Sequence, residues 1–176
     1  MDKNLKEIYF AGGCFWGVEG YFKKVNGVVE TNTGYANGNS DKTTYKEVKE
    51  TDHAETVQIF YDDNVVSLQE LLMRFFSVID PTSLNKQGED VGRQYRTGIY
   101  YKDPSLKPEI EAFIKAMQKK IKEQILVEVS PLKHFVLAEE YHQDYLDKNP
   151  NGYCHINLSS ADKPLDSNWK DIFSSK

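Results

Sequence analysis

The chain has 176 residues, of which 39% are hydrophobic and 28% are charged, as in a typical soluble globular protein. Its 22 Lys and Arg against 27 Asp and Glu give a formal net charge of −5, which disfavours a nucleic-acid-binding protein because such proteins usually carry a basic face. No apolar run approaches the roughly 20 residues that span a bilayer, and residues 1–7 lack the apolar stretch of a secretory signal. We therefore expect one cytoplasmic domain over residues 1–176, monomeric and without membrane or nucleic-acid partners.

The first half of the chain predicts a strand, a helix and two further strands. An apolar run over residues 7–11 predicts a buried strand, which the pair Gly12-Gly13 ends. Apolar residues then follow a helical spacing from Cys14, and Gly27 predicts the end of that helix. The next segments with the composition of strands are 28–35 and 56–62.

The second half begins with a helix that has a clear start signal. Ser67 followed by Glu70 predicts a capping box, and Asp80-Pro81 ends the helix behind it. Residues 80–95 form a polar loop without periodicity, and loops of this length are often functional. The later predicted elements are a strand over 95–101, an amphipathic helix over 104–123, a strand over 126–129 and a short helix over 138–146.

Strands and helices alternate irregularly, and one pair of strands has no helix between its members. This order predicts an α+β fold, a two-layer sandwich with helices packed on a ferredoxin-like mixed sheet and an irregular C-terminal segment. A doubly wound parallel sheet would need a helix after every strand. We expect a core over about residues 7–158 and a tail over 159–176, in which Trp169, Ile172 and Phe173 have helical spacing.

The two cysteines, Cys14 and Cys154, could form a structural disulfide, serve as small buried residues or act as a redox pair. A cytoplasmic location disfavours a structural disulfide, because thiols are kept reduced there, and composition leaves the other two interpretations open. Cys14 lies where a strand turns into a helix, and the first turn of a helix offers unpaired N–H groups and the positive end of the macrodipole. This position predicts a lowered thiol pKa and a nucleophilic sulfur. A small core residue is the alternative.

The run Gly13-Cys14-Phe15-Trp16-Gly17 resembles the active-site signature of the peptide methionine sulfoxide reductases of type A. Other segments match that family's motifs in the same order along the chain. They are Gly34–Ala36, Thr44–Val48, His53–Glu55, Asp80–Thr82, Gln87–Arg96, Ala138–Leu146 and Gly152–Cys154. One such block could occur by chance, whereas this ordered set over residues 7–158 is not expected to.

The resemblance implies thiol-dependent reduction of methionine S-sulfoxide in oxidised proteins and peptides, a protein-repair activity. A sulfoxide sulfur is a poor electrophile until its oxygen is protonated or hydrogen-bonded, so the reaction needs a thiolate and acidic donors. The resemblance makes Cys14 the nucleophile, which becomes a sulfenic acid, and Glu55 the proton donor, for which a raised pKa is expected in an apolar pocket. The other implied roles are hydrogen bonds to the sulfoxide oxygen from Tyr45 and Tyr95, orientation of the site by Asp90, and enclosure of the S-methyl group by Phe15 and Trp16.

The resemblance also makes Cys154 the resolving residue, which converts the sulfenic acid into a Cys14–Cys154 disulfide that thioredoxin reduces. No cofactor or metal is implied, and no later cysteine follows for a second recycling step. The chain departs from the commoner pattern at Asn37, where many members have glycine. It departs again in segment 48–53, which precedes Glu55 and is shorter and more charged than usual.

Three other interpretations stay open at this stage. A cysteine hydrolase would pair Cys14 with His53, His134 or His142, but it would leave Cys154 without a role. A metal site is weaker, because two cysteines and four histidines show no ligand-like spacing. A non-catalytic binding module would require a buried, inert Cys14. Without the family resemblance, Glu55 would be expected in solvent and the tyrosines in the core.

Overall fold

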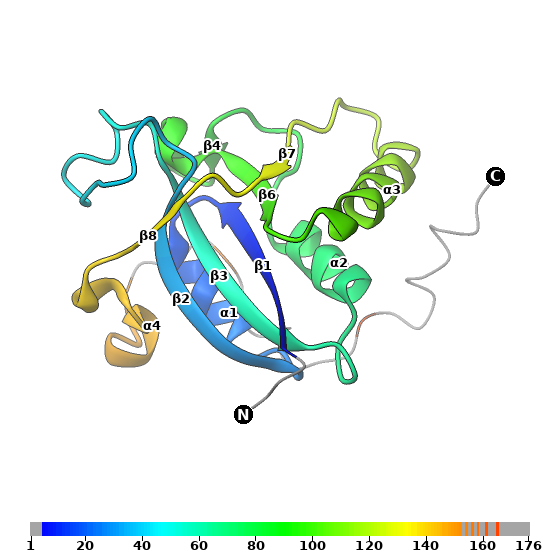
Figure 1. Ribbon diagram of the computed structural model, residues 1–176, viewed down its shortest axis with the longest axis horizontal. Helices are drawn as coiled ribbons and strands as arrows, with labels where there is room; N and C mark the ends of the chain where they lie inside the picture. The colour runs from blue at the N-terminus through cyan, green and yellow to red at the C-terminus, as the bar shows by residue number, and fades with distance from the viewer. Residues whose placement is uncertain are drawn as a thin grey trace.

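The computed structural model describes residues 5–152 and, beyond them, residues 154, 156, 158, 161 and 165. Its centre is a six-stranded sheet with helices packed on it (Figure 1). The strands of this sheet are β1 (Leu5–Gly12), β2 (Val28–Ala36), β3 (Ala54–Asp62), β6 (Thr97–Tyr101), β7 (Glu128–Pro131) and β8 (Phe135–Leu137). The helices are α1 (Phe15–Phe22), α2 (Leu68–Val78), α3 (Lys107–Gln118) and α4 (Tyr145–Lys148).

The strands of the sheet follow the order β7-β6-β1-β3-β2-β8. The four central strands are antiparallel to one another, with α1 between β1 and β2 in the chain and α2 between β3 and β6. This is the ferredoxin-like arrangement of two interleaved β-α-β units. Strand β7 is parallel to β6 and β8 is antiparallel to β2, so the sheet is mixed. The predicted fold class is confirmed.

Strand β1 is covered on both faces, which explains its continuous apolar sequence. On the helical face, the Phe10 ring stacks on Phe75 of α2 at 4.4 Å and contacts Phe22 of α1 at 5.2 Å, measured between ring centroids. On the opposite face, Tyr9 packs edge-on against Phe135 of β8 at 5.3 Å. Packing on both sides fixes the strand's far end, where the chain turns into α1.

The start of α2 follows the sequence prediction, because the Ser67 hydroxyl oxygen accepts the Glu70 N–H at 3.0 Å. The Glu70 carboxylate accepts a hydrogen bond from Arg74 at 2.9 Å, so its side chain bonds a residue one turn further along α2. The helix predicted over 104–123 is shorter, with a 3₁₀ turn over Pro104–Leu106 before α3 and an end at Gln118. The Gln118 side chain bonds the carbonyl oxygens of Ile121 and Glu123 and the N–H of Ile125, and so turns the chain away from the helix.

Other predictions in the second half were partly wrong. The continuous helix over 138–146 is replaced by a 3₁₀ turn (Glu140–His142) and the four-residue α4, because Asp144 between them has a left-handed φ of 54°. The 80–95 loop contains a ladder of β4 (Lys86–Gln87) with β5 (Asp90–Val91) and a 3₁₀ turn (Arg93–Tyr95). Strand β8 was not predicted, and the predicted tail helix lies outside the described residues. None of the helices described for this chain is both long and apolar enough to cross a bilayer.

The Asn37 side chain makes hydrogen bonds that a glycine at this position could not make. Its φ is 54°, a backbone conformation that asparagine tolerates better than most residues. Its side-chain Nδ2 donates to Ser130 Oγ at 3.2 Å and to the Pro131 carbonyl at 3.1 Å, and Oδ1 accepts the Lys133 N–H at 2.7 Å. One buried amide therefore joins the end of β2 to the end of β7 and to Lys133 beyond it.

Replacing Asn37 by Gly keeps the left-handed backbone accessible but removes all three hydrogen bonds. We expect Asn37→Gly to lower the free energy of unfolding by about 1–3 kcal/mol, measured by urea denaturation. Asn85→Gly is the matched control, because Asn85 has a φ of 53° and its side chain makes no hydrogen bond to the described residues. Equal effects of the two substitutions would show that the Asn37 amide contributes nothing to stability.

Candidate active site

The turn from β1 into α1 places Cys14 at the predicted position. Gly13 has a φ of 86°, which a glycine adopts without steric cost, and Cys14 is the N-cap of the helix that begins at Phe15. The Cys14 side chain is only 8% exposed. The N–H of Phe15 donates to Glu55 Oε1 at 3.1 Å, and the N–H of Trp16 hydrogen-bonds the Cys14 sulfur. The first turn of α1 therefore serves both candidate reactive groups.

Glu55 is the second residue of β3, where it pairs with Tyr35 of β2. Its side chain is buried, so the solvated alternative is wrong. Burial raises the pKa of Glu55 to about 8, the charge of Asp90 adds to the rise, and the Phe15 N–H opposes it. The short segment 48–53 therefore still delivers a buried carboxyl group to the site, and that group is mostly protonated at pH 7.

The predicted lowering of the Cys14 pKa is wrong. Burial raises the pKa of this thiol, and the negative charge of Glu55 raises it further, whereas the Trp16 N–H lowers it. The helix N-terminus acts in the expected direction but is outweighed by the loss of water. Below about pH 8 the carboxyl group of Glu55 is protonated and no longer repels a thiolate. The resting site therefore holds one proton on the Cys14 sulfur and one on the Glu55 carboxyl.

Two tyrosines and an aspartate from separate segments surround this pair. Tyr45 is 40% exposed, and its backbone N–H donates to the Glu139 carboxylate at 3.0 Å. Tyr95 is half-buried at the end of the 3₁₀ turn over Arg93–Tyr95. Burial first, and then the charge of Glu55, raises the pKa of both hydroxyls, and Asp90 contributes to both shifts. Neither tyrosine is therefore a core residue, and the charge of Glu55 acts on both hydroxyls.

Phe15 and Trp16 leave α1 in different directions, as adjacent helical residues must. Phe15 is buried, with its ring centroid 5.5 Å from Tyr35 and 5.2 Å from His142. Trp16 is half-buried, and its indole stacks on Tyr145 of α4 with 3.7 Å between centroids and an interplanar angle of 8°. The indole N–H donates to His142 Nδ1 at 3.0 Å. The rings of Phe15, His142, Trp16 and Tyr145 therefore form a continuous aromatic cluster that starts at the residue after Cys14.

His142, Tyr145 and Glu139 belong to the site, but the sequence analysis gave the last two no role. Burial lowers the pKa of His142, so its imidazole is neutral, and because Nδ1 accepts from Trp16 its proton lies on Nε2. Nε2 is buried without a hydrogen-bond partner among the described residues. Glu139 accepts the Tyr35 hydroxyl at 2.7 Å as well as the Tyr45 N–H. Glu139, His142 and Tyr145 follow one another at intervals of three residues. This spacing was a sequence signal that they lie on one side of the chain, although it was interpreted as part of a continuous helix.

Cys154 lies on the flank of α1, and both cysteines are free thiols. It is half-buried, and its Sγ donates to the Ile156 carbonyl at 3.1 Å. It lines a hollow together with Gly20 of α1, Lys24 just beyond the end of α1, and Leu146 and Asp147 of α4.

The histidines do not form a base for Cys14. Across the described residues, no hydrogen bond joins Cys14 to His53, His134 or His142. His53 bonds the Thr51 hydroxyl at 2.8 Å and packs on His134 with 5.0 Å between ring centroids. The geometry therefore does not support a Cys–His hydrolase pair. No cluster of three or more His, Cys, Asp or Glu side chains suited to a metal occurs in the described part of the chain.

Comparison with known proteins gives one consistent result. A family model described as peptide methionine sulfoxide reductase matches residues 6–172, a range that extends past the last matching motif. Mxr1 from Saccharomyces cerevisiae in reduced form is 40% identical, with a TM-score of 0.83 over 89% of this chain and 94% of Mxr1. Methionine sulfoxide reductase A of Corynebacterium diphtheriae is 34% identical, with a TM-score of 0.83 over 87% of this chain and 79% of that one. Mxr1 in complex with Trx2 gives 28% identity and a TM-score of 0.60 over 82% and 87% of the two chains.

The raised pKa of Glu55 predicts how Glu55→Gln changes stability with pH. Between the unfolded pKa of 4.5 and the folded pKa of about 8, the unfolded state releases the proton and the folded state keeps it. The neutral carboxyl therefore adds to the free energy of unfolding of the wild type at low pH. This contribution, on the order of a few kcal/mol, is lost as pH rises from 5 to 8. Gln cannot ionise, so the melting temperature of Glu55→Gln should gain on wild type across this range and level off above it. Exposed Glu50→Gln is the control, and parallel curves for Glu55→Gln and wild type would contradict a neutral Glu55.

Proposed function

Because this chain belongs to the peptide methionine sulfoxide reductase family, as a type A enzyme that reduces methionine sulfoxide with thiols, we propose how its own residues carry out the reaction. Cys14 reduces the S epimer of methionine sulfoxide in oxidised proteins and peptides, and Glu55 supplies the proton. The observation that carries this proposal is the buried Glu55 carboxyl held by the Phe15 N–H next to Cys14. Repair of oxidised proteins follows from this activity.

The first step transfers one oxygen atom. The Cys14 sulfur attacks the sulfoxide sulfur while Glu55 gives its proton to the sulfoxide oxygen. Because Glu55 Oε1 accepts the Phe15 N–H, the other carboxyl oxygen is the one that carries the proton. This attack forms a transient bond between the Cys14 sulfur and the substrate sulfur. The protonated oxygen then moves to the Cys14 sulfur, so a Cys14 S–O bond forms while the substrate S–O bond and the transient S–S bond break. The thiol proton restores Glu55, so thiol and sulfoxide become sulfenic acid and methionine.

The surrounding side chains stabilise and orient the sulfoxide. The hydroxyls of Tyr45 and Tyr95 stay protonated because their pKa values are raised, and they donate to the oxygen on which negative charge develops. Asp90 adds negative charge that helps to keep Glu55 protonated. Phe15 and Trp16 enclose the methyl group. Three different contacts around a chiral sulfur admit one epimer, and the family resemblance points to the S form.

Recycling uses the second cysteine. The Cys154 sulfur attacks the Cys14 sulfenic acid, water leaves and a disulfide forms. A thioredoxin then reduces this disulfide through a mixed disulfide, so that no bound cofactor is needed. Support comes from the position of Cys154 on the flank of α1 and from the solved complex of Mxr1 with Trx2.

Single-turnover measurements with a blocked methionine sulfoxide peptide test the roles of the cysteines. Without reductant, wild type should release about one methionine equivalent per enzyme from the S epimer and end as the Cys14–Cys154 disulfide. Cys154→Ser should release the same equivalent and stop as a trappable sulfenic acid, and Cys14→Ser should release none. Chromatography of the product and non-reducing peptide mapping give the readouts.

Control measurements test the choice of sulfoxide epimer and the dependence on the reductant. Comparable release from the R epimer would contradict the proposed pocket, and two free cysteines after turnover would remove Cys154 from the mechanism. Thioredoxin-driven turnover should largely vanish in Cys154→Ser, because thioredoxin exchanges with disulfides. A small dithiol, which attacks the sulfenic acid directly, should restore it.

Glu55→Gln tests the acid. It should slow the first step by roughly 10²–10⁴ while leaving substrate binding unchanged, since only the proton is removed. The wild-type rate should fall as pH rises through about 8, where Glu55 loses its proton, and this limb should be absent in the variant. Rapid-quench assays from pH 6 to 10 measure both. A wild-type rate and pH profile in Glu55→Gln would place the proton donor elsewhere.

A further inference from the structure

Glu19 is a carboxylate that the proposed chemistry does not use, yet it lies fully buried in the middle of α1. Its Oε2 accepts the Thr31 hydroxyl of β2 at 2.9 Å, and its Oε1 accepts the backbone N–H of Asp144 at 2.8 Å. A buried carboxylate is costly unless its hydrogen bonds are made. These two bonds tie β2 and the residue before α4 to the helix that begins at Cys14.

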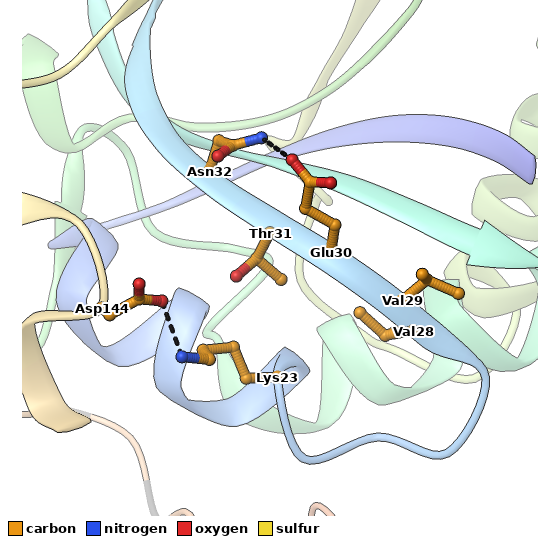
Figure 2. A pocket seen from close by; sticks show the side chains of 7 residues that line it. All are labelled: Lys23, Val28, Val29, Glu30, Thr31, Asn32 and Asp144. Carbon is orange, nitrogen blue, oxygen red and sulfur yellow. Dashed lines mark hydrogen bonds and ion pairs between the residues drawn. The ribbon is translucent and has the colours of Figure 1, made fainter. Parts of the chain in front are cut away.

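A second polar contact lies one turn further along the same side of α1. Lys23 Nζ donates to Asp144 Oδ1 at 2.6 Å and also contacts the Asp147 carboxylate of α4. Figure 2 shows Lys23 reaching from α1 to Asp144 at the edge of a hollow that Thr31 also lines. The two aspartates of the α4 region thus share one cation of α1.

Two apolar contacts complete this side of the helix. Trp16 stacks on Tyr145, and at Gly20 a Cβ atom would lie 2.9 Å from Leu146 Cδ1, so the backbone of α1 approaches α4 closely. Residues three and four positions apart share one face of a helix. We call the stripe formed by Trp16, Glu19, Gly20 and Lys23 the α4 dock.

The short helix depends on this dock. A helix of four residues cannot hold itself in water, since isolated helices are marginal below about 12 residues. Before α4, the chain is fixed at Gln143, whose side-chain amide bonds both the N–H and the carbonyl of Thr33. Beyond α4, Cys154 lines a hollow bounded by Gly20 of α1 and by Lys24, which follows that helix.

Building on the proposed resolving role of Cys154, we propose that the α4 dock holds α4 against α1 and so positions Cys154 for attack on the Cys14 sulfenic acid. Glu19 and Lys23 are then positioning residues, which touch neither substrate nor reacting sulfur. With α4 docked, the tether from Lys148 to Cys154 is six residues. Without it, the tether from Gln143 is eleven, and an effective concentration that falls as the −3/2 power of length drops about 2.5-fold before orientation is lost.

The test compares the two chemical steps in one reaction. Glu19→Leu removes the acceptor for Asp144, Lys23→Met removes both ion pairs, and Lys107→Met, which removes an exposed ion pair to Glu111, is the control. Rapid-quench samples of the reductant-free turnover give methionine release and, by non-reducing peptide mapping, Cys14–Cys154 disulfide formation. Methionine release should keep its wild-type rate in all three variants.

Disulfide formation should slow by about three- to tenfold in Glu19→Leu and about twofold in Lys23→Met, with no change in Lys107→Met. Glu19→Gln, which keeps an acceptor oxygen, should restore at least half of the wild-type rate. Amide hydrogen exchange over residues 144–149 should become faster in Glu19→Leu and Lys23→Met. If Glu19→Leu fails to fold, Lys23→Met with its partly exposed side chain decides the question.

The outcomes distinguish this proposal from the one it builds on. Normal methionine release with unchanged or faster disulfide formation in Lys23→Met and Glu19→Leu would overturn the positioning role alone. Absence of a Cys14–Cys154 disulfide in wild type would instead overturn the proposed mechanism. A slowed second step with an intact first step supports both.

Discussion

The hydrogen bond from the Phe15 N–H to Glu55 Oε1 links the scaffold to the chemistry. It joins β3 to the first turn of α1, two elements 40 positions apart in the sequence, and it uses a helix-terminal donor that would otherwise lack an intrahelical partner. Glu55 is fixed by its place in the sheet, and Cys14 by the turn after β1. Their relative position is therefore set by the fold, and one backbone donor decides which carboxyl oxygen of Glu55 is left without that bond.

The same arrangement lowers the thiolate fraction of Cys14 but keeps a proton on Glu55 at neutral pH. Excluding water raises the pKa of both Cys14 and Glu55, so the site rests in a doubly protonated state. That state suits oxygen transfer, because the sulfoxide needs a proton before its sulfur accepts electrons. A strongly acidic thiol beside an ionised Glu55 would supply the nucleophile but lack the acid.

Local signals predicted much of this structure. The Ser67 cap, the run at β1 and the N-cap position of Cys14 depend on neighbours within a few residues, and all three are present. The thiol pKa failed because the helix dipole is local, whereas burial and Glu55 come from distant parts of the chain. The helix over 138–146 failed because Gln143 is extended and Asp144 has a left-handed φ, and both residues are bonded to distant parts of the chain, Gln143 to Thr33 and Asp144 to Glu19.

The raised pKa of Cys14 also bears on how this thiol reacts with peroxides. Peroxides oxidise thiolates faster than thiols, and oxidation beyond the sulfenic acid to the sulfinic acid is essentially irreversible. A buried thiol that keeps its proton at neutral pH is a slow target for such oxidants. The burial that costs Cys14 its ready ionisation therefore also protects it from hyperoxidation.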